Sequence, residues 1–262
     1  MKTNVLLSRP DADQQRQQNF DHYYRHYYNQ EAKQYDKVRF HSSKAFGKEY
    51  AEHAVIYDLL ALSAGQSVLD APTGTGRIAA YLAERGLRMT AVDLTENMLL
   101  EAQQRATQVG LAEQMVCVQA NACQLPFESN SFDGVIANRF FHLLPISLHR
   151  PFILDMWRVL RPGGVLLVQF RSALTGGGLV WLHELWRRYR EGRKSRYYLW
   201  PHQMRSLFEG MENLSLHGIS PAALRFVRGP FPQAANMLEG VTRDGWHTFL
   251  THRRIFVRAV KA

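Results

Sequence analysis

Two aspartates and two glycines form the pattern in this sequence that is best suited to binding a small molecule. Asp70 closes a short apolar run, and Gly74 and Gly76 follow it in the order Asp-x-x-x-Gly-x-Gly. Glycines at these positions allow a tight turn that brings backbone N–H groups close to a ligand. A carboxylate before the turn repels a pyrophosphate and attracts a cationic amino group, so a dinucleotide site is the weaker interpretation. Asp93 adds a second carboxylate at the end of a second apolar run.

These carboxylates can meet only if the runs before them are parallel strands that end at one edge of a sheet. The alternation of apolar runs with helical periodicity predicts βαβ units and a doubly wound, Rossmann-like α/β sheet. Seven strands are expected, at 67–71, 88–93, 115–120, 133–138, 164–170, 213–218 and 255–260. The helices between them are expected at 76–85, 96–109 and 146–160, with earlier helices at 20–35 and 51–62.

Composition excludes several classes of protein. The chain has 262 residues, of which 46% are hydrophobic and 21% charged, as expected for a globular protein with a large core. Two cysteines make a disulfide scaffold unexpected, and no cysteine–histidine cluster has zinc spacing. There is no apolar run of signal-peptide or membrane-span length, so a cytoplasmic location is expected. The net charge of +9 favours anionic partners without choosing among nucleic acid, acidic lipid and metabolite.

Further segments, taken in order, resemble one family. The pattern from Asp70 to Gly76 is similar to motif I of the class I S-adenosylmethionine (SAM) methyltransferases. Thr95-Glu96-Asn97-Met98-Leu99, Asn121-Ala122-Cys123-Gln124-Leu125-Pro126-Phe127 and Leu160-Arg161-Pro162-Gly163-Gly164 follow in register with the family's later segments. The resemblance covers about residues 45–172 and is strongest to the branch that includes the ubiquinone and menaquinone methyltransferases. It implies a mostly parallel sheet with an antiparallel last strand, formed as a closing hairpin.

The resemblance also implies SAM as cofactor, with S-adenosylhomocysteine (SAH) as product, and a set of residues that bind it. Asp93 would bind the ribose hydroxyls, Met98 would pack on adenine, and Asp70 would orient the methionine end. Asn121 stands where the family usually has Asp, and its carbonyl oxygen can accept a hydrogen bond from the adenine amino group. The predicted cofactor-binding residues are Asp70, Ala71, Thr73, Gly74, Gly76, Asp93, Leu94, Met98, Asn121, Ala122 and Asn138.

The predicted catalytic residues follow the fourth strand, in the segment Asn138-Arg139-Phe140-Phe141-His142. Side chains there should project towards the transferred methyl group. His142 is the histidine best placed to act as a general base, with a capping or packing histidine as the alternative. Arg139 could anchor an anionic substrate or the SAM carboxylate.

Outside the strands, residues 1–44 are interpreted as a mobile N-terminus followed by a tyrosine-rich helix. That helix is either a surface helix whose tyrosines cover the core or a lid over the active site. Residues 45–262 form the methyltransferase domain, with substrate-side insertions at about 173–212 and 221–250. The basic run from 187 to 196 is either a solvated face or a binding surface for an anionic or lipid-like substrate.

The sequence therefore predicts a SAM-dependent methyltransferase that acts on a small-molecule or amphipathic anionic acceptor by O-, C- or N-transfer. An RNA methyltransferase is a second interpretation, motivated by the net charge, although no appended RNA-binding motif is visible. A SAM-binding protein of the same fold with a non-methylating role is a third, because fold does not fix function. The sequence does not indicate an oligomeric state.

Overall fold

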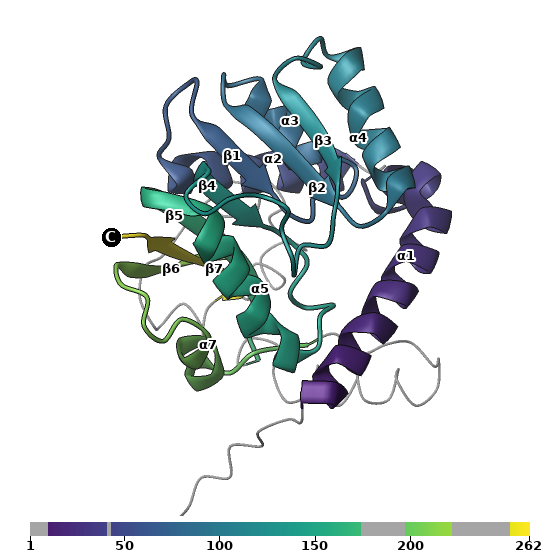
Figure 1. The fold of residues 1–262 in the computed structure, drawn as a ribbon. Coiled ribbons are helices and arrows are strands. Elements are labelled where there is room, and N and C mark those ends of the chain that lie inside the picture. Colours follow the sequence, from purple (N-terminus) through teal and green to yellow (C-terminus); the bar gives the residue numbers. More distant parts are fainter. Residues whose placement is uncertain (1–9, 41–42, 174–196, 222–251) are drawn as a thin grey trace, which may run out of the picture.

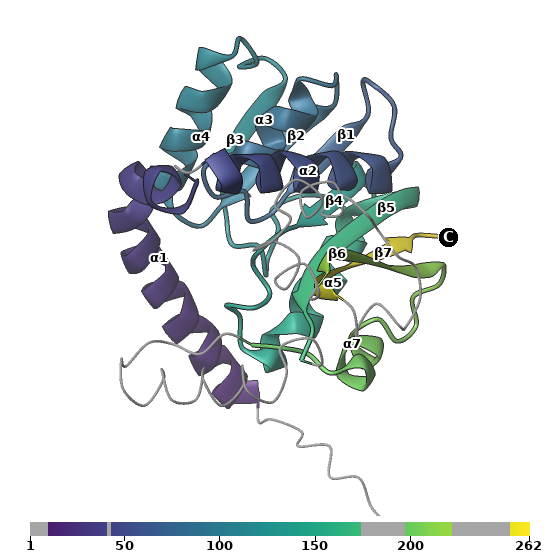
Figure 2. The same ribbon diagram turned by 180° about the vertical axis from the view of Figure 1, so that it is seen from behind.

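The computed structural model describes residues 10–40, 43–173, 197–221 and 252–262 (Figures 1 and 2). In this part of the chain a seven-stranded sheet has the order β3-β2-β1-β4-β5-β7-β6. The strands are β1 (Ser67–Asp70), β2 (Arg88–Asp93), β3 (Met115–Gln119), β4 (Phe132–Ala137), β5 (Leu160–Arg171), β6 (Leu214–Pro221) and β7 (His252–Val260). Strand order reverses beside β1, which makes the carboxyl ends of β1 and β4 the switch point where such sheets bind ligands.

Strand directions agree with the mostly parallel sheet that was expected. β1 pairs in parallel with β2 and β4, β2 with β3, and β4 with β5. β7 runs antiparallel to both of its neighbours, β5 and β6. The predicted antiparallel last strand and closing β6–β7 pair are therefore confirmed.

Helices cover both faces of the sheet. The described helices are α1 (Pro10–Phe40), α2 (Ser43–Leu60), α3 (Arg77–Ala83), α4 (Glu96–Gln108), α5 (Ile146–Val159) and α7 (Pro201–Leu207). α5 and α7 lie in front of the sheet in Figure 1, and α2 lies in front of it in Figure 2. α1 runs beside the N-terminal end of α4. This is the layered arrangement of a doubly wound fold.

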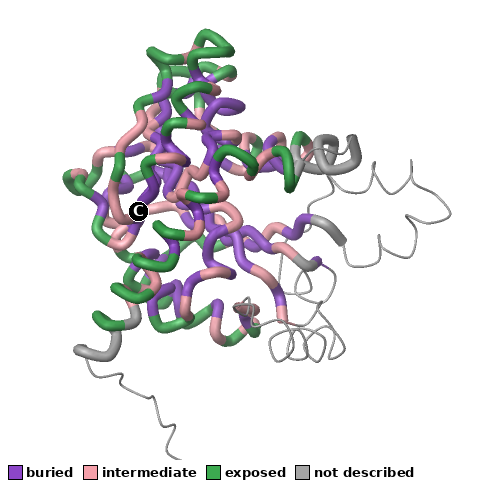
Figure 3. Tube along the Cα trace, turned by 90° about the vertical axis from the view of Figure 1, so that its right-hand side faces the viewer, coloured by how far each residue is buried: buried purple, intermediate pink, exposed green. Residues whose placement is uncertain are grey.

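Residue alternation along the central strands explains why both faces must be covered. Leu69 and Val135 point into the cluster under α5 and α7, whereas Val68 and Ile136 point into the cluster under α2 and α3. All four side chains are fully buried, as expected for parallel strands packed on both faces. Figure 3 shows the buried residues along the interior and the exposed ones on the outer turns.

Several boundaries differ from the sequence-based expectation, including the starts of α1, α2 and β5. α1 begins at Pro10, so residues 10–19, which were expected to be mobile, form its first turns. A proline at the start and the i,i+4 contact of Gln17 with Asp21 both favour this earlier start. α2 begins at Ser43 rather than near residue 51. β5 begins at Leu160, because Leu160 pairs with Phe132 across a bulge.

Several predicted features lie outside the described residues. They are the basic run at 187–196 and most of both insertions, at 173–212 and 221–250. Strand β6, expected at 213–218, is present at Leu214–Pro221, and helix α7 (Pro201–Leu207) precedes it. Among the described helices, none combines the length and apolar character needed to cross a membrane.

Candidate cofactor and acceptor site

The turn between β1 and α3 is tied to the end of β2 by a short set of hydrogen bonds. The Thr73 hydroxyl donates to the Asp70 carboxylate at 2.8 Å. The Gly74 N–H donates to the Asp93 carboxylate at 2.9 Å, and the Thr73 N–H donates to the carbonyl of Val92 at 2.7 Å. The two predicted carboxylates thus meet at one edge of the sheet, held by the same turn.

The two glycines of the turn have different surroundings. Both have positive φ, +58° at Gly74 and +71° at Gly76, which L side chains rarely adopt. A Cβ built on Gly76 would lie 2.7 Å from the Cβ of Ala102, so this glycine lets α4 pack against the turn. No described atom lies within 4 Å of a Cβ built on Gly74, which faces open space. Gly76 therefore serves the fold, and Gly74 leaves room for a ligand.

Asp70 is a buried carboxyl group, and its hydrogen-bond donor among the described residues is the neutral Thr73 hydroxyl. Burial raises its pKa to about 7, with nearby Asp93 contributing in the same direction and the Thr73 hydroxyl opposing it. Asn138 lies beside it in the lining of the same cavity, and its Oδ1 atom is buried with no hydrogen-bond partner among the described residues. Two unsaturated acceptors at one place favour a ligand that donates hydrogen bonds and carries positive charge.

Asp93 is fully buried at the end of β2. One carboxylate oxygen accepts from the backbone N–H and hydroxyl of Thr95, at 2.9 and 2.7 Å, and the other accepts from Gly74. Burial raises the pKa of Asp93, and these hydrogen bonds oppose the rise. The carboxylate is held in one orientation beside the turn.

A cavity opens between the glycine turn, α1 and the end of β4. Its lining combines hydrogen-bond acceptors, aromatic rings and cations from α1, α2, β1, α3 and α4 and from the loops that follow β1 and β4. The lining residues are Tyr24, Tyr28, Tyr35, His53, Asp70, Pro72, Thr73, Gly74, Thr75, Arg77, Ile78, Met98, Asn138, Arg139, Phe140 and Leu143. Of the predicted site residues, the cavity brings together Asp70, Thr73, Gly74, Met98, Asn138 and Arg139.

The other predicted residues lie around this cavity without lining it. Ala71 is fully buried in the extension of β1, where its N–H donates to the Ile136 carbonyl at 3.0 Å. Asn121 and the buried Ala122 and Leu94 lie towards the β3 side, and His142 is buried with its carbonyl accepting from the Tyr197 N–H at 2.8 Å. Ala71, Gly76, Asp93, Leu94, Asn121, Ala122 and His142 are absent from the lining.

Helix α1 is fastened to the loops that carry these residues. Asp36 accepts a hydrogen bond from the Thr75 hydroxyl at 2.9 Å and forms ion pairs with Arg77 and Arg105. Nearer the middle of the helix, the Asn29 side chain and carbonyl bond the backbone N–H and side-chain amide of Asn97, at 3.2 and 2.9 Å. α1 is therefore held against both the glycine turn and the start of α4.

The far wall of the cavity rests on a buried charge cluster. Glu52 of α2 is fully buried and forms ion pairs with Arg139, which follows β4, and with Arg254 of β7. The Gln169 amide of β5 also donates to Glu52, at 2.7 Å. Burial alone would raise the pKa of Glu52, but Arg254, Arg139 and Gln169 hold it well below its usual range. At this wall one carboxylate is therefore shared by two guanidiniums.

His53 is the histidine that lines the cavity. It lies next to Glu52 on α2, is 7% exposed, and packs against the Tyr81 ring with centroids 5.2 Å apart. Burial lowers its pKa to about 4, with Arg139, Arg105 and Arg85 contributing and Glu52 opposing. The imidazole is therefore neutral at pH 7 and can accept a proton or a hydrogen bond.

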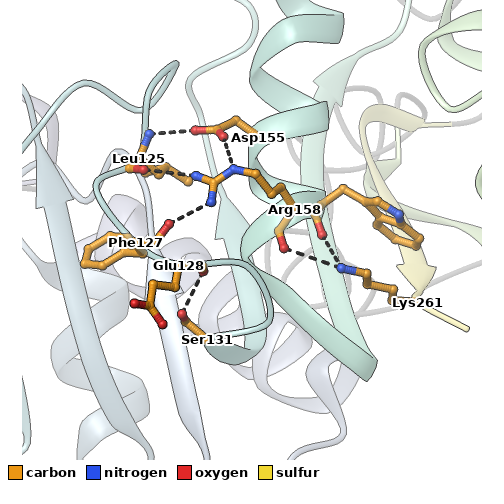
Figure 4. A network of polar contacts seen from close by, with 8 residues as sticks. Leu125, Phe127, Glu128, Ser131, Asp155, Arg158 and Lys261 are labelled. Atoms are coloured by element: carbon orange, nitrogen blue, oxygen red, sulfur yellow. Dashed lines mark hydrogen bonds and ion pairs between the residues drawn. The ribbon is translucent and has the colours of Figure 1, made fainter.

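The segment from 121 to 127 is held from behind by α5 (Figure 4). Asp155 accepts from the Leu125 N–H at 2.6 Å and pairs with Arg158, whose guanidinium donates to the carbonyls of Phe127 and Leu125 at 2.7 and 3.0 Å. Lys261, near the C-terminal end, donates to carbonyls at the end of α5. This network fixes the backbone of the segment in which Asn121 and Ala122 were predicted to read adenine.

Sequence reasoning missed Glu52, His53, Arg77 and Arg254. Glu52 and His53 stand among Ala54, Val55 and Ile56, and polar side chains on an otherwise apolar helix face are a signal that could have been used. Arg254 carries no such signal, because it lies 202 residues from its partner.

Comparison with known proteins assigns the central part of the chain. Residues 69–168 match a family described as a methyltransferase domain. The ubiquinone/menaquinone biosynthesis C-methyltransferase UbiE of Cereibacter sphaeroides is 35% identical over 129 residues, which is 48% of this chain and 51% of that protein. The UbiE of Paracoccus denitrificans is 36% identical over the same shares of both chains. The chain thus spans about half the length of the curated relatives it matches.

Solved structures share the fold over most of the chain. Geranyl diphosphate C-methyltransferase from Streptomyces coelicolor, solved with Mg²⁺, geranyl diphosphate and SAH, has a TM-score of 0.63 at 12% identity and covers 93% of this chain and 98% of its own. Phosphoethanolamine N-methyltransferase 2 from Haemonchus contortus, solved with SAH, has a TM-score of 0.54 at 23% identity. The match covers 79% of this chain and 52% of that protein. At these identities the likeness establishes the Rossmann-like fold.

Proposed function

We propose that the chain transfers a methyl group from SAM to a small-molecule acceptor, because residues 69–168 match a family described as a methyltransferase domain. The observation that carries the proposal is the cavity in which the glycine turn and its carboxylate face aromatic rings and a guanidinium. A cofactor can lie at the first wall, which the glycine turn forms, while an acceptor approaches from the second wall, which contains Arg139.

The residues of the first wall fit SAM. The buried Asp70 carboxyl and the unpartnered Asn138 Oδ1 are acceptors for an ammonium group, and open space at Gly74 lets a ligand approach the backbone. Asp93 would hold the ribose hydroxyls and Met98 would pack on adenine, with Leu94, Asn121 and Ala122 completing that side. When bound, the cofactor supplies a methyl group on a positively charged sulfur.

The chain contributes mainly by positioning. A displacement at a methyl carbon needs the acceptor atom in line at about 3 Å, and holding it there accounts for much of the rate. Tyr24, Tyr28 and Phe140 form an aromatic wall around this space, and the two tyrosines, both on α1, are buried there. Aromatic walls also exclude water from the reacting groups.

The second wall supports an acceptor with an anionic group and an apolar part. Arg139 lines the cavity, where its guanidinium carries hydrogen-bond donors, and its partner Glu52 is shared with Arg254. Leu143 and Phe140 supply apolar surface next to it. A phosphate, carboxylate or phenolate beside Arg139 would accept charge-assisted hydrogen bonds from its guanidinium.

Transfer to an acceptor that carries a proton requires a base, and two histidines are candidates. His142 is the base predicted from its place after β4, and His53 lines the cavity in neutral form. Replacing the acting base by alanine should lower the rate about a hundredfold or more. Turnover of His142→Ala and His53→Ala from pH 6 to pH 9 would assign the role, because the loss should shrink where the acceptor is already ionised.

Methyl-labelled SAM incubated with the protein and a cell extract tests the function. We expect label to enter an anionic small molecule, and Arg139→Gln should raise the acceptor KM while leaving SAH affinity unchanged. Arg88→Gln, an exposed residue at the opposite end of β2, is the control. Label recovered in tRNA alone would point to an RNA methyltransferase. SAM binding without any labelled product would point to a non-methylating role.

A further inference from the structure

We infer that Asp21 of helix α1 supplies a carboxylate that recognises the adenine amino group of the cofactor beside Asn121. The inference rests on the proposed function and extends it, because it brings a residue from the N-terminal helix into the cofactor site. Cofactor recognition would then be complete only while α1 is docked.

The hydrogen bonds of Asn121 fix the orientation of its side-chain amide. Its Oδ1 atom accepts from the backbone N–H of Cys123 at 2.9 Å. Its Nδ2 atom donates to the Asp21 carboxylate at 2.8 Å. A backbone N–H must face an oxygen and a carboxylate must face an NH₂ group, so the reverse assignment would lose both bonds.

This orientation leaves Asn121 poorly equipped to read adenine by itself. The amino group of adenine is a donor, and the NH₂ end of Asn121 is a donor as well. The single oxygen of Asn121 already accepts one N–H and is neutral, so it offers a weaker acceptor than a carboxylate. The carboxylate next along the hydrogen-bond chain belongs to Asp21.

Asp21 has the capacity for an additional donor. Its Oδ1 atom accepts from the Gln17 amide at 2.8 Å and its Oδ2 atom from Asn121, and a carboxylate has about four acceptor positions in all. Burial raises the pKa of Asp21, against the effects of Gln17, Arg25 and Asn121. A further donor would stabilise the ionised carboxylate at this partly buried position.

The neighbouring turns of α1 lie over the same site. Tyr24, one turn along from Asp21, is buried and lines the cavity with Met98. Its pKa is raised well above the usual value by burial and by the charge of Asp93, which puts its hydroxyl within electrostatic reach of the ribose-binding carboxylate. Gln17, one turn before Asp21, accepts from the Cys123 thiol at 3.3 Å. Asp21 is thus held between the proposed ribose and adenine contacts.

Calorimetric titration with two ligands tests the inference on the full chain. SAH carries the adenine amino group, and S-inosylhomocysteine has a carbonyl oxygen in its place. We expect the parent to prefer SAH by about tenfold or more, and Asp21→Asn to lose most of that preference, because a charge-assisted hydrogen bond is lost. Glu31→Gln, which removes the same charge from the same helix, should keep the parent's preference.

A double variant separates recognition from damage to the helix. Asn121→Asp alone places two carboxylates together at pH 8, so it should weaken SAH binding. In Asp21→Asn/Asn121→Asp the amide and carboxylate change places, and the preference for SAH should return. If Asp21→Asn keeps the parent's preference for SAH, or if the double variant does not recover it, the inference about Asp21 is overturned and the proposed function is not. Failure of the parent to bind SAH would overturn the proposed function as well.

Discussion

The two walls of the cavity are built in opposite ways: the proposed cofactor wall contains the glycine turn, and the proposed acceptor wall contains Arg139. Most of the cofactor wall comes from one stretch, residues 70–93, in which Thr73 donates to Asp70 and Gly74 donates to Asp93, 3 and 19 residues apart. The acceptor wall is assembled from α2, the end of β4, β5 and β7, and Glu52 bonds partners 87, 117 and 202 residues away. Local sequence can encode the first wall, whereas only the closed sheet creates the second.

Buried carboxylates on the two walls also differ in charge state. Glu52 is matched by Arg254 and Arg139, which hold its pKa well below the usual range despite burial. Asp70 has the Thr73 hydroxyl as partner, and burial raises its pKa to about 7. The difference shows that the acceptor wall has neutralised its carboxylate with its own cations, while the cofactor wall is suited to a cation that arrives with the ligand.

The largest effect is expected from breaking the acceptor wall with Glu52→Gln. Two partly buried guanidiniums would lose the Glu52 carboxylate, and removing one partner of a buried ion pair costs about 3–5 kcal/mol. The free energy of unfolding, measured in urea at pH 7, should fall by this amount. Because the folded pKa of Glu52 is lowered, its stabilising contribution is present above pH 4.5 and is lost as the pH falls through its folded pKa.

Asp58→Asn is the matched control for Glu52→Gln, because it removes a carboxylate from an exposed position on the same helix. It should change the free energy of unfolding by less than about 0.5 kcal/mol. Equal stability of Glu52→Gln and Asp58→Asn would show that the cluster does not hold the acceptor wall together.

The two glycines sharpen the comparison within the cofactor wall. Gly76→Ala should lower the free energy of unfolding by about 2–3 kcal/mol, because the new Cβ would overlap Ala102 and the φ angle is positive. Gly74→Ala meets no described atom and should cost about 1 kcal/mol from its φ angle alone, yet it should weaken SAH binding. Thermal unfolding and calorimetric titration of both variants make the test. Weaker SAH binding in a well-folded Gly76→Ala than in Gly74→Ala would reverse the roles.

A smaller effect is expected from pH on cofactor affinity. Asp70 binds a proton as the pH falls through about 7, and the ammonium group of SAH is attracted by the ionised carboxylate. SAH affinity should therefore fall about tenfold between pH 8 and pH 6, since one pKa unit is about 1.4 kcal/mol. Calorimetry in two buffers of different ionisation enthalpy would also detect proton release on binding. As a control, the SAH affinity of Asp70→Asn should not change with pH. A parent affinity that also does not change with pH would contradict the argument.

The same contrast explains what the sequence could predict. The strand segments, the turn at Gly74 and the positions of Asp70 and Asp93 follow from local periodicity and spacing. The antiparallel end of the sheet, which the family resemblance implied, is also present. The contact between Asp21 of α1 and Asn121 joins residues 100 positions apart, for which local patterns hold no information. The placement of Arg254 at the cavity wall depends on β7 joining the sheet between β5 and β6. The roles of His142 and of the 187–196 run stay predictions.

Titration with SAH tests most directly the claim that the cofactor lies at the carboxyl edge of β1 and β2. Asp93→Ala should weaken binding by about 2–3 kcal/mol, because it removes a buried carboxylate that would accept two ribose hydroxyls. Asp133→Ala removes a carboxylate that bonds Ser67 and Arg161 at the opposite edge of the sheet, and it should leave the affinity unchanged. Equal affinity of Asp93→Ala and the parent, or an equal loss in both variants, would contradict the account.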